Sequence, residues 1–242
     1  MRGWWREIAG LVLPVACGGC GRPRTEVCED CRAALCGALP RRVRPTPEPA
    51  GLPVVHAAAA YENAVRAVLL AHKERGALPL SRVLGRALAG AVRAGTGQMD
   101  GPGPLLLVPV PSARRAVAAR GHDPARRIAL AAAGELRRGG MPARVVTVLR
   151  QRRPVADQSG LGARQRRANL AGALEVVAGG ERLLAAERVV LVDDLLTTGA
   201  TLTEAARAVD AAGGRGGSLS GVRQAAVVAA SPSAFEINRN RR

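Results

Sequence analysis

Short runs of aliphatic residues, separated by segments of helical periodicity, constrain the fold of this chain more than any other feature. The runs are VVHAAAAY, LLLVPV, RVVTVL, RVVLVDD and QAAVVAA. Helical patterns lie between them in ENAVRAVLLAHKERG, in LPLSRVLGRALAGAVRAG, and at 122–138 and 200–212. Because continuous apolar strands alternate with helices, the sequence predicts an α/β fold with a parallel sheet that helices cover on both faces.

The composition is that of a globular protein with room for one core and a small added module. Of the 242 residues, 48% are hydrophobic and 23% are charged, which argues against disorder. The net charge is +17, and Lys73 is the only lysine among 36 basic residues. Such a surface attracts polyanions, but a coding bias toward arginine explains it equally well. An aromatic platform for nucleic-acid bases is not expected from four aromatic residues: Trp4, Trp5, Tyr61 and Phe235.

Four of the five cysteines form a pattern typical of a metal site. Cys17 and Cys20 make one CxxC, and Cys28 and Cys31 make a second, within CGGCGRPRTEVCEDC. Each CxxC places two thiolates on one tight turn, and two such turns complete a tetrahedral set for zinc. Two disulfides are the alternative, which a reducing cytosol disfavours. We interpret Cys36 as a small buried hydrophobe.

The N-terminus imitates a signal sequence imperfectly. Its apolar run at 8–16 contains Gly10 and Pro14, and it is far shorter than the roughly 20 residues that span a bilayer. We therefore expect an N-terminal helix packed on a neighbouring module, no membrane span and a cytoplasmic protein.

A proline-rich stretch, PRRVRPTPEPAGLP, marks a change in composition and favours an extended connector. We therefore divide the chain into three parts: a four-cysteine zinc-binding module with its N-terminal helix at 1–44, a linker at 45–53 and a second domain at 54–242. Within that domain, residues 230–242 are expected to form a flexible basic tail.

The aliphatic run RVVLVDD ends in two carboxylates, Asp193 and Asp194. Ligands bind beyond the carboxyl ends of parallel strands, and two successive acids cannot both face into the sheet. The next residues, LLTTGAT, offer hydroxyls and free backbone N–H groups at the start of a helix, where an anion is favoured. Acids followed by an anion site suggest a sugar phosphate. The alternative is an ordinary strand end with a threonine cap.

The stretch VVLVDDLLTTGAT resembles the signature of type I phosphoribosyltransferases, which use 5-phosphoribosyl 1-diphosphate (PRPP) with magnesium. The resemblance implies that Asp193 and Asp194 are the catalytic pair that contacts the ribose hydroxyls. It also implies that a loop grips the 5-phosphate, through Leu195, Leu196, Thr197, Thr198, Gly199, Ala200 and Thr201.

The order of parts along nearly the whole chain resembles the ComF family of competence-associated proteins. These parts are the four-cysteine module, VPVP at 108–111, RG at 120–121 and DQSGLGARQRRANLAGAL at 157–174. The resemblance implies a type I phosphoribosyltransferase-like parallel sheet with a small zinc-ribbon-like module at its N-terminus. The chain departs from the family pattern at RGHDP, 120–124, which affects the expected acceptor side.

Transfer from PRPP displaces pyrophosphate, so the site needs cations. The loop after LLLVPVP offers Arg114, Arg115 and Arg120, because guanidinium binds phosphate bidentately; a solvated basic loop is the alternative. The polar stretch 150–170 is expected to form a mobile flap, with Gln158 and Arg166 as its candidate ligands.

Two classes of function stay open. One is an enzyme that transfers or releases the phosphoribosyl group of PRPP, with an acceptor that the sequence does not identify. The other is a non-catalytic PRPP sensor or an accessory protein of DNA uptake, with single-stranded DNA or competence proteins as partners. A homodimer is compatible with both.

Overall fold

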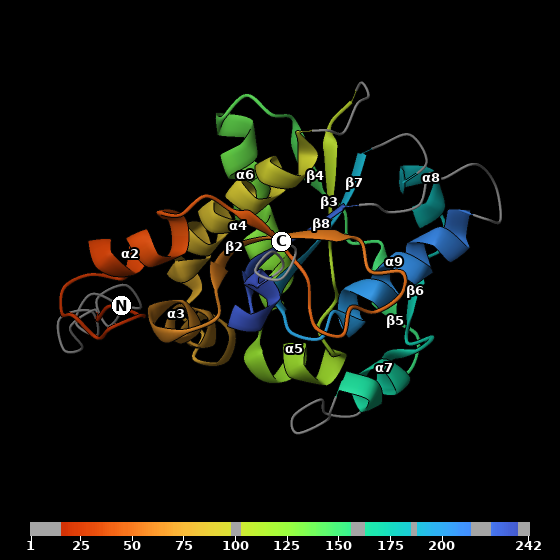
Figure 1. The fold of residues 1–242 in the computed structure, drawn as a ribbon. Coiled ribbons are helices and arrows are strands. Elements are labelled where there is room, and N and C mark those ends of the chain that lie inside the picture. The colour runs from red at the N-terminus through yellow and green to blue at the C-terminus, as the bar shows by residue number, and fades with distance from the viewer. Residues whose placement is uncertain (1–15, 98–102, 156–162, 185–187, 214–223, 237–242) are drawn as a thin grey trace, which may run out of the picture.

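The computed structural model describes residues 16–97, 103–155, 163–184, 188–213 and 224–236. Six strands form one sheet in the order β1-β2-β8-β7-β3-β4 (Figure 1). Every neighbouring pair is parallel except β1 and β2. The strands are β1 Arg41–Val43, β2 Val54–Ala60, β3 Leu105–Pro109, β4 Ala143–Val145, β7 Arg188–Leu196 and β8 Gln224–Ala230. The predicted α/β fold is confirmed, and the sheet is parallel as predicted except for its edge strand β1.

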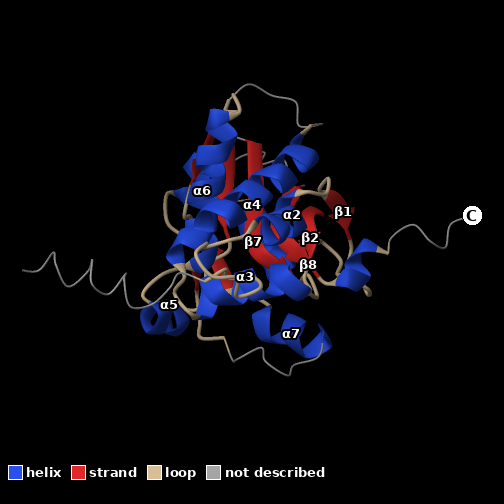
Figure 2. Cartoon of the chain, turned by 90° about the vertical axis from the view of Figure 1, so that its left-hand side faces the viewer, coloured by secondary structure: helices blue, strands red, loops and turns tan. Residues whose placement is uncertain are grey.

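Helices cover both faces of this sheet. One face packs against α2 Glu29–Cys36, α3 Asn63–Glu74, α4 Ser81–Thr96 and α6 Pro124–Arg138, which lie in front of the strands in Figure 2. The opposite face packs against α9 Ala200–Gly213 and α8 Gly180–Leu184. Alternate residues of β3 serve the two cores, since Leu105 and Leu107 belong to the first and Leu106 and Val108 to the second.

Local sequence signals explain where these helices begin and end. Asp123 caps α6 by accepting a hydrogen bond from the backbone N–H of Arg126 at 3.2 Å, and Pro124 follows at the first helical position. After α3, Gly76 adopts a left-handed φ of 65°, which ends the helix before the short 3-10 turn Leu78–Leu80.

The segment RVVTVL is one strand by pattern but two strands in the structure. Its first half is β4, which pairs with β3 at the edge of the large sheet. The last residue of the run, Leu149, is the first residue of β5 Leu149–Gln151. This strand pairs antiparallel with β6 Leu174–Val176 in a separate hairpin. An ion pair of 2.9 Å between Arg150 and Glu175 joins the two short strands. The expectation of a single strand here is wrong, because the chain leaves the sheet edge after residue 146.

Two further helices lie near the carboxyl ends of the strands, where the sequence predicted loops. The first is α5 Arg114–Arg120, which follows β3, and the second is α7 Ala163–Leu170, between β5 and β6. Figures 1 and 2 both place α5 and α7 at the same end of the sheet. Neither segment has a long apolar stripe, so the periodicity that predicted the larger helices is missing here.

The cysteine segment packs directly on α3. Cys17, Cys28 and Cys31 belong to the same hydrophobic core as Val68, and Cβ atoms added at Gly18 and Gly19 would meet side chains of the core at 2.8 Å or less. The proline-rich connector packs against the loop after β7. A Cβ atom added at Gly199 would lie within 3.3 Å of the side chains of Pro49 and Leu52. Among the described residues, no helix is long and apolar enough to cross a membrane.

Candidate active site

The two predicted acids lie within the last four residues of β7. The strand continues through Asp193 and Asp194 to Leu196, so the acids are part of the strand rather than the residues after it. The side chain of Asp194 is 10% exposed, and Asp193 is half-buried. The Asp194 backbone N–H donates to Asp193 Oδ1 at 2.8 Å, which fixes the Asp193 carboxylate at the edge of the sheet.

Lys73 is a site residue that the sequence analysis missed. It lies in the last turn of α3, and its Nζ donates to Asp194 Oδ2 at 2.8 Å. The lysine and the acid are 121 positions apart in the chain, so no local motif joins them. Its one sequence signal was its identity, since it is the only lysine in a chain that otherwise uses arginine.

The three charged groups Lys73, Asp193 and Asp194 shift one another's pKa values in different directions. Burial raises the pKa of Asp193, and the neighbouring Asp194 carboxylate raises it further. Burial also acts to raise the pKa of Asp194, but the Lys73 ammonium outweighs it and lowers that pKa below its usual value. Asp194 in turn raises the pKa of Lys73. The site therefore holds one firmly ionised carboxylate and one that takes up a proton more readily.

A loop that we call the anion loop, Thr197–Gly199, connects β7 to α9. Gly199 has a left-handed φ of 76°, and the Ala200 backbone N–H approaches Thr198 Oγ1 at 3.5 Å. Of the residues expected in the phosphate loop, Leu195 and Leu196 belong to β7, whereas Ala200 and Thr201 form the first turn of α9. A glycine turn before the first N–H groups of a 14-residue helix has the features of an anion site.

A cavity of about 430 Å³ joins the acid pair to the start of α9. The charged and hydroxyl residues in its wall come from α3, the β3–α5 connection, α5, β7, the anion loop and α9: Lys73, Ser112, Arg115, Arg120, Asp193, Asp194, Thr197 and Thr201. The apolar part of the wall comes from the β5–β6 hairpin and the segment between its two strands, through Val155, Leu170 and Leu174. Charged and hydroxyl residues from six segments thus converge on one cavity at the carboxyl ends of β3 and β7.

The three arginines predicted for pyrophosphate do not share one location. Arg115 and Arg120 line the cavity with the acid pair, whereas Arg114 lines a neighbouring one. The guanidinium of Arg120 forms two hydrogen bonds with Glu74, at 2.7 and 2.9 Å. Arg115 Nη2 donates to the Val155 carbonyl at 3.3 Å.

The predicted flap residues fall only partly within the structure. Gln158 lies outside the described residues. Arg166 lies on α7, but its side chain is not among those that the structure describes. At the base of this segment, Val155, Leu170 and Ala173 form a small core with Ala200 of α9. The predicted flap is therefore attached at both of its ends to the helix that begins at the anion loop.

No family model matches this chain, and no curated protein matches it in sequence. The assignment of the site therefore depends on the geometry and chemistry of its own residues.

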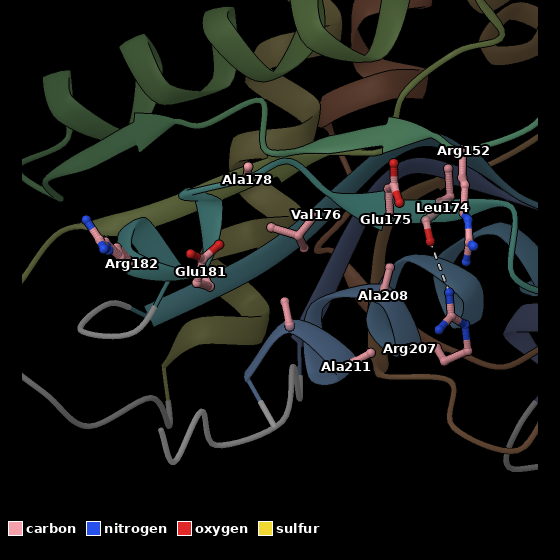
Figure 3. Close-up of a pocket in the computed structure, with 11 residues that line it drawn as sticks. Arg152, Leu174, Glu175, Val176, Ala178, Glu181, Arg182, Arg207, Ala208 and Ala211 are labelled. Atoms are coloured by element: carbon pink, nitrogen blue, oxygen red, sulfur yellow. Dashed lines mark hydrogen bonds between the residues drawn. The ribbon is translucent and has the colours of Figure 1, made fainter. Parts of the chain in front are cut away.

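A cavity of about 550 Å³ lies away from the acid pair between β6, α8 and α9 (Figure 3). Two of the charged groups in its wall, Arg207 and Glu175, already have partners. Arg207 forms two hydrogen bonds with Glu204 and one of 3.0 Å with the Leu174 carbonyl, the last drawn as a dashed line in Figure 3. Glu175 pairs with Arg150. Because these contacts fasten β6 to α9, we interpret this cavity as a consequence of hairpin packing and take the acid-pair cavity as the candidate site.

The four predicted metal ligands form a separate cluster. The sulfur atoms of Cys17, Cys20, Cys28 and Cys31 all lie within 4.8 Å of one another, and none of them is in a disulfide. The Sγ atoms of Cys20 and Cys28 are 3.6 Å apart, close to the spacing of about 3.8 Å that a tetrahedron with bonds of about 2.3 Å requires.

One thiol of this cluster, Cys17, ionises more readily than a free cysteine because its pKa is lowered. Burial opposes ionisation of Cys17, but backbone N–H groups of Cys20, Cys28 and Gly19 outweigh it and lower the pKa of Cys17 to about 6. A thiolate is the form that binds metal. The cluster can therefore hold a metal ion in the arrangement that the CxxC spacing predicted.

Proposed function

We propose that this chain is a ComF-like phosphoribosyltransferase, which binds magnesium-PRPP at the carboxyl end of β7 and transfers its 5-phosphoribosyl group with loss of pyrophosphate. One observation carries the proposal: the acid pair and the anion loop open onto the same cavity as Lys73 and two arginines. This combination offers acceptors for two hydroxyls and cations for two phosphate groups, which is the recognition that a diphosphorylated ribose needs.

In this proposal each part of the ligand has its own partners. The ribose hydroxyls donate to Asp193 and Asp194, and the 5-phosphate lies on the anion loop at the start of α9. The diphosphate lies toward Arg115 and Arg120, which line the same wall. Magnesium bound with the diphosphate would neutralise further negative charge, and carboxylate oxygens are the ligands it prefers.

The chemistry needs no nucleophile from the protein. The bond between the anomeric carbon and the diphosphate oxygen breaks, the electron pair leaves with pyrophosphate, and a lone pair of the acceptor forms the new bond. The protein contributes by stabilising the charge that develops on the leaving group. Lys73 lies within reach of this role, since its side chain is 35% exposed and lines the cavity while its ammonium neutralises Asp194.

The four-cysteine cluster fits zinc as a structural ion. Its four thiols match the ligand set and the spacing of closed zinc sites. It packs on α3, the helix whose last turn carries Lys73, so we infer that the bound metal stabilises the position of α3 rather than taking part in the chemistry.

Calorimetric titration with PRPP in the presence of magnesium tests the proposal. We expect saturable binding to the unaltered chain and none to the double variant D193N/D194N. Glu62→Gln serves as the control, because Glu62 is an exposed acid outside the cavity. Failure of the unaltered chain to bind PRPP at millimolar concentration would refute the proposed function.

A turnover screen separates the enzyme from a PRPP sensor. Release of pyrophosphate in the presence of nucleobases or amines would identify a transferase and its acceptor. Tight PRPP binding without release of pyrophosphate under any of these conditions would favour the sensor.

A further inference from the structure

We propose that a second cavity, beside the candidate active site, binds a ligand through two or more linked phosphate groups. This cavity measures about 340 Å³ and lies between the start of α5 and the segment that follows β5. Its wall contains four arginines, Arg114, Arg115, Arg152 and Arg153. The volume lies within the range of small-ligand pockets, which starts at about 300 Å³.

The positive charge in this cavity lacks an acidic counterpart among the described residues that line it. Arg153 Nη2 donates to the carbonyls of Asn169 and Ala171 at 2.9 Å each, and Arg115 donates to the carbonyl of Val155. Carbonyl groups hold a guanidinium in place without neutralising its charge. Two of the four arginines are thus anchored and remain available to an anion.

The neighbouring residue on β5 shows the opposite arrangement. Arg150 lies outside the cavity and forms an ion pair of 2.9 Å with Glu175. Among the described residues no carboxylate forms an ion pair with Arg152 or Arg153, although Arg152 also lines the cavity of Figure 3, where Glu175 and Glu181 form part of the wall. Four like charges around one space repel one another, and a multivalent anion removes this repulsion more effectively than a monovalent one.

The chemistry of the wall favours phosphate over other anions and over neutral ligands. Guanidinium groups bind phosphate oxygens in pairs, which suits a chain of linked phosphates that meets several arginines at once. The rest of the described wall is Ala113, Gln151, Pro154 and Val155, with no aromatic ring on which a base could stack. Recognition is therefore through the phosphates.

The second cavity is continuous with the first. Ala113, Arg115, Gln151 and Val155 line both of them. A ligand held by its phosphates on Arg114 and Arg152 would extend toward the acid pair. This part of the inference rests on the proposed function: if PRPP occupies the first cavity, the second ligand is a phosphorylated acceptor rather than a free base.

The double variant R114A/R152A tests the site, with inorganic tripolyphosphate as the probe. Both side chains are exposed on the cavity wall. The control is R82A/R86A, two exposed arginines of α4 outside the cavities, which removes the same net charge. We expect calorimetry to show a loss of about tenfold or more in tripolyphosphate affinity for R114A/R152A, and little change for the control. An equal effect in both variants, or none in R114A/R152A, would overturn the proposal.

Further titrations separate this site from the PRPP site. D193N/D194N should lose PRPP and retain tripolyphosphate. If the unaltered chain does not bind PRPP but binds tripolyphosphate through Arg114 and Arg152, the proposed function is refuted and the second site is supported. If R114A/R152A instead loses only PRPP, the cavity belongs to the first site and the inference is wrong. Adenosine diphosphate is the last probe: affinity equal to that of inorganic pyrophosphate indicates recognition of phosphates alone, and tighter binding indicates a nucleotide ligand.

Discussion

The variants Asp193→Asn and Asp194→Asn should change the stability of the fold in opposite directions, although the two residues are adjacent. The pKa of Asp193 is raised, first by burial and then by the Asp194 carboxylate. An acid with a raised pKa makes the folded state less stable as pH rises above the unfolded value. Asp193→Asn removes that penalty at neutral pH, and we expect a gain of about 1 kcal/mol in the free energy of unfolding.

Asp194→Asn should instead destabilise the protein. It removes the partner of Lys73 across a contact of 2.8 Å. Breaking a fully buried ion pair costs about 3–5 kcal/mol. The Lys73 side chain keeps 35% of its exposure, so water replaces part of the lost interaction, and we expect about 1–2 kcal/mol.

The pH dependence of Asp194→Asn follows from the directions of the two pKa shifts. The lowered pKa of Asp194 gives stability that is present above its unfolded value of 3.8 and is lost as pH falls through the folded value. The raised pKa of Lys73 gives stability that is present below 10.5 and is lost as pH rises through the folded value. The contribution of the Lys73–Asp194 pair to the difference from the unaltered chain should therefore be constant between these limits and shrink outside them.

Thermal and urea unfolding across this pH range provide the assay. For a chain of this size 1 kcal/mol corresponds to a shift of about 2–4 °C in Tm, so the two variants should differ by about 4–12 °C at neutral pH. Both variants should still lose affinity for PRPP. Destabilisation by Asp193→Asn at neutral pH, or equal shifts for the two variants, would refute the electrostatic account of the acid pair.

Other predictions concern the glycines and the cysteine cluster. Gly199→Ala should cost about 1–2 kcal/mol in urea unfolding, because φ is 76° and Leu52 lies 3.1 Å from the added Cβ; an unchanged midpoint would contradict the packing of the connector. Gly85→Ala should cost about 1–3 kcal/mol, because its Cβ would meet the backbone of α6 at 2.8 Å. Cys20→Ser should lower the zinc content measured by mass spectrometry and Cys36→Ser should not, and a chelator should lower Tm only for chains that contain zinc.

Most strands of the sheet could be predicted from the sequence because their signals are local. β8 coincides with the run QAAVVAA, and β2 and β3 each differ from their runs by one residue. Each of these strands is apolar on both sides, since helices cover both faces, so an unbroken aliphatic run identifies it. The cysteine cluster was predictable for a similar reason, because the two CxxC turns fix the ligands within 15 residues.

The acid pair and the anion loop were predictable because their residues are consecutive. Asp193, Asp194 and the anion loop follow one another, and the structure places them together at the end of β7. Lys73 could not be found in this way, because the contact with Asp194 depends on how α3 packs against the sheet. The division of the arginines between two cavities likewise follows from α5, a short helix without an apolar stripe that the sequence did not reveal.

The contact between the connector and Gly199 affects how the parts of this chain can be compared. Pro49 and Leu52 lie against the turn of the anion loop. A fragment that starts at residue 54 would therefore lack the side chains that support the loop, together with the cysteine cluster. Weak ligand binding by that fragment would report a damaged loop and not a catalytic role of the cysteines. The full-length chain stripped of its metal is the sounder comparison, because it keeps the connector against the loop while removing only the ion.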